Sequence, residues 1–284
     1  MHPLVAFNLF GAILEIKSYN LFALLGALAG TAAALPLLRR EGLPARGASG
    51  LLICMAAAFL AGARLFNFAL NPAAYSGALN LWSLRLVGLS LYGGICGSLL
   101  ALLIWSRAAG TSAWPLLDAM VLPTGLAFAW ARLGCYFNGC CAGRATASRW
   151  GVAFPIPEEG RELFSSFLSL LVESNFTVNL YPTQLFELAL ALLGLIPVAW
   201  FYYRRRLPPG AAFLIYGIWF SLMRLLILPL RSLPYREAVT KIFYPLFYIG
   251  LIGAGLYLLK RLYKRDKPGE AEGPGEKSSR SSFR

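Results

Sequence analysis

The chain has 284 residues, of which 58% are hydrophobic and only 14% are charged, whereas an ordinary soluble domain has about 25% charged residues. This composition excludes a water-soluble globular protein and predicts an all-α polytopic membrane protein. The formal net charge of +13 does not indicate a nucleic-acid partner, because basic loops and tails orient membrane proteins and meet anionic lipid head groups.

Seven apolar stretches are long enough to cross a bilayer as helices. We expect spans at residues 18–38, 50–70, 87–105, 115–133, 182–203, 210–230 and 242–259. Residues 1–17 are apolar but short and interrupted, and they lack the basic start and cleavage site of a signal peptide. We expect this segment to lie in the membrane interface.

The polar segments divide the chain into a transmembrane domain, residues 1–259, and a tail, residues 260–284. The longest connection covers residues 135–180, and we expect an amphipathic helix at 164–173 within it. The tail is rich in glycine, serine, glutamate and lysine, which predicts disorder.

The distribution of lysine and arginine predicts the orientation of the helices. The richer side carries Arg39, Arg40, Arg46, Arg107, Arg204, Arg205, Arg206 and the tail from Lys260 onward. The other side carries Lys17, Arg85, Arg236 and the 135–180 segment. We therefore expect a cytoplasmic C-terminus, with the N-terminus and the 135–180 segment on the periplasmic side.

Residues 132–144 have the highest density of groups that bind or react, with two arginines, three cysteines, an asparagine and three glycines. A buried arginine beside glycines is suited to a phosphate, because guanidinium bonds it in a bidentate way and glycine lets backbone N–H groups approach. The segment predicts a phosphate site at the edge of the membrane.

Charged residues inside spans are costly and are therefore candidates for function. They are Arg64, Asp118, Arg132, Glu187 and Arg224, with Arg231 on nearly the same helix face as Arg224. Arginines that converge at one depth would form an anion pocket, together with Gly93, Gly94 and the glycines of the 132–144 segment. In the alternative, each arginine reaches outward to water or pairs with Glu187 to hold helices together.

The cysteines fall into two groups. Cys54 and Cys96 lie within spans, and we expect them to be packing residues rather than to carry chemistry. Cys135, Cys140 and Cys141 lie near arginines, which favour thiolate, so they could be a nucleophile, a redox pair or packing residues. Zinc is the least favoured role, because the spacing lacks a CxxC pair and the only histidine is His2. We therefore predict no metal and no cofactor.

Several segments together resemble one enzyme family. Residues 62–65 read Gly-Ala-Arg-Leu, and residues 88–94 read Gly-Leu-Ser-Leu-Tyr-Gly-Gly, similar to the family's Gly-Leu-Ser-Phe-His-Gly-Gly. Residues 132–144 resemble its signature Arg-x-Gly-Asn-Phe-x-Asn-Gly-Glu-x-x-Gly-Arg, and residues 150–155 and 181–187 resemble the pieces that follow. In this order, the motifs identify the chain as similar to the prolipoprotein diacylglyceryl transferases, as a divergent member.

The resemblance implies a seven-helix enzyme of the bacterial inner membrane. Such an enzyme moves the diacylglyceryl group of phosphatidylglycerol onto a cysteine thiol of a preprolipoprotein and releases glycerol phosphate. It implies that Arg132 holds the phosphate, and we assign catalytic roles to Arg132, Tyr92, Cys135 and Cys140. The expected substrate-binding residues are Arg64, Gly93, Gly94, Asn138, Gly143, Gln184, Glu187, Arg224 and Arg231.

The chain departs from the family pattern where the family has its acid, base and amide groups. Tyr92 stands at the family's histidine, Cys135 at its asparagine, and Cys140 and Leu228 at its two glutamates. Tyrosine has an ordinary pKa near 10 and is a poor general base at neutral pH. Three hypotheses stay open: a transferase acting on a protein thiol or related acceptor, a membrane thiol redox protein using Cys140 and Cys141, and a non-catalytic phospholipid-binding protein.

Overall fold

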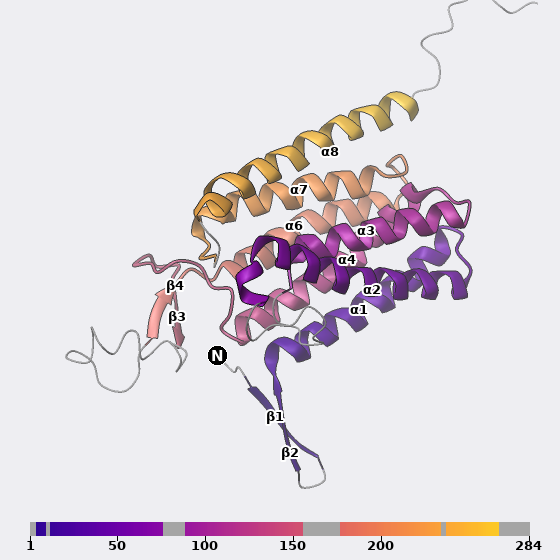
Figure 1. Ribbon diagram of the computed structural model, residues 1–284. Helices are drawn as coiled ribbons and strands as arrows, with labels where there is room; N and C mark the ends of the chain where they lie inside the picture. The colour runs from indigo at the N-terminus through magenta and orange to yellow at the C-terminus, as the bar shows by residue number, and fades with distance from the viewer. Residues whose placement is uncertain (1–3, 10–11, 76–88, 156–176, 234–236, 267–284) are drawn as a thin grey trace, which may run out of the picture.

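The computed structural model describes residues 4–9, 12–75, 89–155, 177–233 and 237–266. In this part of the chain, seven helices are long and apolar enough to cross a membrane, and they lie side by side in one bundle (Figure 1). They are α1 (Ser18–Arg40), α2 (Ala45–Leu70), α3 (Leu91–Ala108), α4 (Ala113–Phe137), α6 (Thr183–Tyr203), α7 (Ala211–Ile227) and α8 (Tyr244–Asp266). Short helical turns are η1 (Pro72–Tyr75), η2 (Leu228–Leu230) and the π-helical η3 (Val239–Phe243). The chain is a multi-pass membrane protein.

The seven predicted spans are confirmed as helices, but several of their ends differ. Helix α2 begins before the expected residue 50, and α3 begins after the expected residue 87. Helix α8 continues to Asp266, so the first residues of the expected disordered tail are helical, because lysine and arginine favour a helix and its C-terminal end. The rest of the tail and the predicted helix at 164–173 lie outside the described residues.

Two small β-hairpins add to the helical architecture that the sequence predicted. Strands β1 (Leu4–Leu9) and β2 (Ala12–Lys17) pair antiparallel, directly before α1. Strands β3 (Val152–Pro155) and β4 (Thr177–Leu180) also pair antiparallel, directly before α6. Both hairpins lie at the end of the bundle where α1 and α6 begin and α4 ends (Figure 1).

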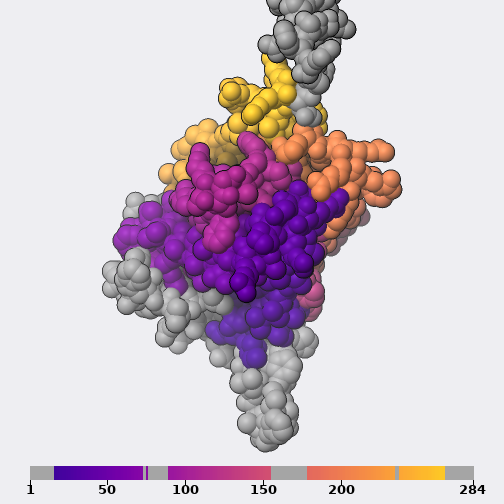
Figure 2. Space-filling view, turned by 90° about the vertical axis from the view of Figure 1, so that its right-hand side faces the viewer, coloured from indigo at the N-terminus to yellow at the C-terminus, as the bar shows by residue number. Residues whose placement is uncertain are grey.

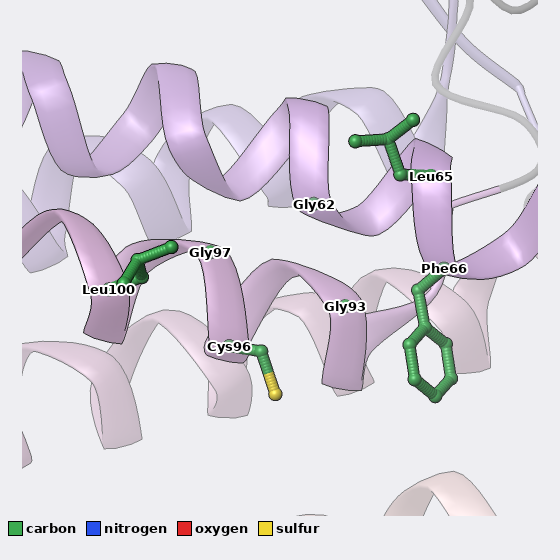
Figure 3. A pocket seen from close by; sticks show the side chains of 7 residues that line it. All are labelled: Gly62, Leu65, Phe66, Gly93, Cys96, Gly97 and Leu100. Carbon is green, nitrogen blue, oxygen red and sulfur yellow. The ribbon is translucent and has the colours of Figure 1, made fainter.

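Helices α2 and α3 approach each other through glycines. A Cβ atom added to Gly62 would lie 2.3 Å from the carbonyl oxygen of Gly93, and one added to Gly97 would lie 2.2 Å from that of Ala58. Small residues allow such approach in a bilayer, where lipid removes much of the hydrophobic drive for helix association. A hollow of about 370 Å³ lies along this contact, lined by glycines and by side chains including Phe66 and Cys96 (Figure 3).

Asp118 of α4 has a structural role at the opposite end of the bundle from the hairpins. Its carboxylate accepts hydrogen bonds from the backbone N–H groups of Gly210, at 2.6 Å, and Phe213, at 2.8 Å. These are amide groups at the start of α7, which have no partner within their own helix. Asp118 therefore caps α7, and its negative charge also suits the helix N-terminus.

The same end gathers basic residues that the sequence assigned to one side. Figure 2 looks onto this end, where the indigo α1–α2, magenta α3–α4 and orange α6–α7 connections lie together. Arg40 donates to the Tyr203 carbonyl at 3.3 Å, and Arg205 pairs with Glu41 at 3.4 Å. The order of the helices explains the grouping. Because each span runs opposite to the one before it, every second connection lies at the same end of the bundle. The side of the membrane that this end faces stays a prediction.

Candidate active site

The site is built around Glu187, a carboxylate that is only 1% exposed. Oε2 of Glu187 lies 2.7 Å from Nε of Arg132, and its Oε1 lies 2.7 Å from Nη1 of Arg224. Arg231 also donates to Oε1 through Nη1. The arginines come from α4, α7 and the residue after η2, whereas Glu187 lies on α6. One carboxylate therefore connects segments that are far apart in the sequence.

These four residues form a buried cluster with two more positive than negative charges. Within the described residues, the Nε–H groups of Arg132, Arg224 and Arg231 have no hydrogen-bond partner. Arg132 and Glu187 are therefore close enough for an ion pair, but the Nε–H group of Arg132 is not oriented for a hydrogen bond to Glu187. Buried polar groups without partners are costly. An anion with several acceptor oxygens would fit both the excess charge and the unused donors.

Aromatic rings hold two of the arginines. The ring centre of Phe128 lies 4.8 Å from Cζ of Arg132, and that of Tyr92 lies 5.8 Å from Cζ of Arg224. Tyr92 packs in turn against Phe247 and Tyr248 of α8, with ring centres 5.2 and 5.6 Å away. Its buried hydroxyl has no hydrogen-bond partner within the described part of the chain. Tyr92 therefore lies beside the cluster, and its catalytic role stays a prediction.

The cysteine segment forms a tight turn at the end of α4, after the cap residue Asn138. Gly139 and Cys141 both have left-handed backbone conformations, with φ of 73° and 61°. This conformation costs a non-glycine residue roughly 1–3 kcal/mol. Two residues at the start of α6 hold the turn: Gln184 donates to the Cys140 carbonyl at 2.7 Å and Thr183 to the Cys141 carbonyl at 3.0 Å.

The turn brings the sulfur atoms of Cys135, Cys140 and Cys141 within 4.8 Å of one another. All three cysteines are free. Hydrogen bonds from Cys135 and Cys140 lower the pKa of the Cys141 thiol, and the charges of Arg132 and Arg231 lower this pKa further. The cysteines and the arginine cluster therefore belong to one site.

Gly143 connects the cysteine turn to Arg231. Its N–H donates to the Tyr181 carbonyl at 2.8 Å, and it forms an isolated β-bridge with Arg231. A Cβ atom at Gly143 would lie 2.4 Å from the Leu230 carbonyl oxygen. Glycine at this position lets the two backbones meet, so Gly143 positions Arg231.

The structure thus brings many of the predicted site residues together and gives several of them a second role. Gln184, predicted to bind substrate, holds the cysteine turn. Gly93 and Gly94 pack against Gly62 and the Phe59 ring of α2, which gives a packing reason for glycine at both positions. Arg64 is buried on α2. The substrate-binding roles of these residues and of Asn138 stay predictions.

The remaining cysteines differ from expectation. Cys54 and Cys96 were expected to be packing residues, but both are exposed in the protein. A helix in a bilayer can present small apolar residues to lipid, so burial by protein is not required there.

Sequence reasoning also missed Thr183 and Phe128. No sequence signal marks either residue, because Thr183 bonds the Cys141 carbonyl and Phe128 packs on Arg132 only in the folded chain.

Comparison with known proteins identifies the family of the chain. A family model described as prolipoprotein diacylglyceryl transferase matches residues 4–237. The chain belongs to this family. The family match covers α1 to α7, and therefore includes all four members of the arginine–glutamate cluster.

Three curated members of the transferase family are 30–33% identical to this chain over the matched residues. The phosphatidylglycerol–prolipoprotein diacylglyceryl transferase of Chloroflexus aggregans is 30% identical over 241 residues, 80% of this chain and 76% of that protein. The one from Solidesulfovibrio magneticus is 30% identical over 196 residues, 67% of each. The one from Rhizobium meliloti is 33% identical over 132 residues, 45% of this chain and only 39% of that protein. Against this last relative, the match covers less than two thirds of the relative's length.

Proposed function

We propose that the chain is a bacterial inner-membrane transferase that moves the diacylglyceryl group of phosphatidylglycerol to a cysteine thiol of a preprolipoprotein or a related acceptor. The observation that carries the proposal is the buried cluster of Arg132, Arg224, Arg231 and Glu187, with its excess positive charge and unused N–H donors. Membership in the transferase family supports the same reaction.

The chemistry suits an arginine cluster. The acceptor sulfur forms a bond to the glyceryl carbon while the bond from that carbon to the phosphate oxygen breaks. The bond's electron pair leaves with glycerol phosphate, so the phosphate changes from one negative charge to two. Arginines that are fixed before the reaction stabilise this developing charge without reorganisation. In this proposal Glu187 orients the arginines and does not act as the base, because all three arginines engage its oxygens.

A basic cleft next to the cluster suits the leaving head group. The cleft has a volume of about 400 Å³ and is lined by Arg231, Arg144 and Lys241, together with Pro229 and Pro245. Arg231 therefore faces both the buried cluster and this cleft. Glycerol phosphate is small, polar and doubly charged. A basic cleft would therefore hold it better than an apolar path between helices would.

Mass spectrometry of the purified chain with phosphatidylglycerol and a lipobox peptide tests the proposal. We expect the peptide to gain one diacylglyceryl group and glycerol phosphate to be released, whereas a peptide with serine in place of the cysteine should not react. Arg132→Ala should lower the rate at least about 100-fold, as removal of a key charge-stabilising donor does. The matched control is Arg149→Ala, because Arg149 is exposed beside Trp150. It should leave the rate unchanged.

Other outcomes would contradict the proposal. A chain that binds intact phosphatidylglycerol without turnover, while the Chloroflexus aggregans relative reacts alongside, would be a phospholipid-binding protein. Thiol–disulfide exchange that depends on Cys140 and Cys141, without a lipid product, would support the redox hypothesis instead.

A further inference from the structure

We propose that Cys135, Cys140 and Cys141 bind one zinc ion and leave its fourth position open for the acceptor thiol. The three sulfur atoms already lie within 4.8 Å of one another. Thiolates bound to tetrahedral zinc lie about 3.8 Å apart, given a Zn–S bond of about 2.3 Å. Small side-chain rotations would close this difference. The spacing of the cysteines did not predict a metal site, because the backbone turn at Gly139 and Cys141 creates the cluster.

The charges around the cluster favour this occupant. Three thiolates and one zinc ion carry a net charge of −1, and the neighbouring arginine–glutamate cluster carries two excess positive charges. Soft sulfur ligands select zinc over magnesium or calcium.

The burial of the three ligands leaves one side accessible. Cys135 is buried, Cys140 is partly buried and Cys141 is exposed. An ion between them would lie at the surface of the turn, with its fourth position toward the accessible side. Catalytic zinc sites have this pattern of three protein ligands and one exchangeable position. The bonds from Gln184 and Thr183 to the carbonyls of Cys140 and Cys141 hold the ligands in place.

The site would supply a step that the described residues otherwise lack. This inference rests on the proposed function, in which the acceptor thiol must lose its proton before attack. Glu187 is engaged by three arginines, and Tyr92 is a buried phenol. A thiol that binds zinc is deprotonated outright, with its proton released to solvent. The sulfur then attacks the glyceryl carbon, the carbon–oxygen bond breaks, and its electrons leave on the phosphate. The product is a neutral thioether, which binds zinc weakly and departs.

Metal content and cobalt spectroscopy on the full chain test the inference. After purification without chelators, we expect one zinc per chain by elemental mass spectrometry. Single Cys135→Ser or Cys140→Ser variants should lower zinc affinity more than about 100-fold, since even residues that support metal ligands affect affinity 10–100-fold. The matched control is Cys54→Ser, because Cys54 is an exposed free cysteine outside the cluster. It should bind zinc normally.

The open position has its own readout. Cobalt in place of zinc should give visible bands that shift when the lipobox peptide is added, and a serine peptide should not shift them. A chain without metal, or one with a disulfide within the cluster, would overturn the inference. Cobalt bands that do not shift when the lipobox peptide is added would also overturn the inference, because the metal would then be structural.

The two proposals fail separately. Metal content and the cobalt shift require no phosphatidylglycerol. If zinc and thiol bind but no lipidated peptide forms, the zinc inference stands and the proposed transfer fails. If lipidated peptide forms at full rate in the Cys140→Ser variant without metal, the transfer stands and the zinc inference fails.

Discussion

Replacing Glu187 with glutamine is the most direct test of the buried cluster. The side chain keeps its size and loses its charge, so three arginines would remain without an anion. The amide can accept with one oxygen only, and its NH₂ group would face guanidinium donors. We therefore expect Glu187→Gln to destabilise the helix bundle and to reduce transfer.

The structure sets the size of the effect. Opposite unit charges about 4 Å apart attract by about 4 kcal/mol at an effective dielectric constant of 20. Glu187 makes three such pairs, but the arginines around it repel one another and all members lose hydration. Removal of one partner from a buried pair costs about 3–5 kcal/mol in proteins where this has been measured. We expect a loss in this range in the free energy of unfolding.

The measurement is reversible unfolding in mixed detergent micelles, followed by helix content. The matched control is Glu237→Gln, because Glu237 also pairs with a basic residue, Lys241, at 2.9 Å, but is 83% exposed. An exposed pair of this kind contributes about 0.3–0.5 kcal/mol. Added glycerol phosphate should restore part of the stability of Glu187→Gln by supplying the missing anion. Equal losses in the free energy of unfolding for the two variants would refute the inference that Glu187 is buried and pairs with three arginines at once.

Three further substitutions, two of them paired with a control substitution, test packing, capping and support of the cysteine turn. Gly93→Ala would place a Cβ atom 2.3 Å from a backbone carbonyl of α2 and should cost at least about 1–3 kcal/mol in thermal unfolding. Gly217→Ala on α7, where nothing lies within 4 Å, should instead stabilise by up to about 1 kcal/mol. Asp118→Ala should cost about 0.5–2 kcal/mol because it removes the cap of α7, whereas Ser112→Ala should cost little, since Ser112 makes no cap bond. Gln184→Leu should weaken zinc binding about 10–100-fold in a competition titration by releasing the Cys140 carbonyl, and unchanged affinity would contradict that role.

The seven spans could be predicted from the sequence because about 20 apolar residues are enough to cross a bilayer. Their ends could not, since hydrophobicity does not report backbone hydrogen bonding. Helix α4 continues past the expected residue 133 to Phe137 and ends where Gly139 turns into a left-handed conformation. The hairpin of β1 and β2 was missed for a different reason: its residues read LVAFNL and AILEIK, which lack the strict apolar–polar alternation of a half-buried strand.

The site was predictable in its components and only partly in its arrangement. Arginines in separate spans indicate a convergent cluster or, in the alternative, ion pairs with Glu187. The structure has both, because one carboxylate contacts three arginines. Spacing in the sequence could not reveal the sulfur cluster, because Cys135 and Cys140 meet only through the turn that follows α4.

The position of Glu187 in the chain also affects how the protein assembles during synthesis. Arg132 on α4 enters the membrane before Glu187 on α6, and Arg224 on α7 enters after both. Until α6 arrives, Arg132 lacks the Glu187 carboxylate, and water or lipid head groups near the surface can neutralise its charge. When α6 arrives, Glu187 pairs with Arg132 and so joins α4 to α6. The same carboxylate pairs with Arg224 when α7, the last helix of the cluster, enters. A ribosome pause or a long insertion between α4 and α6 would therefore prolong the time for which an early helix holds an unpaired charge.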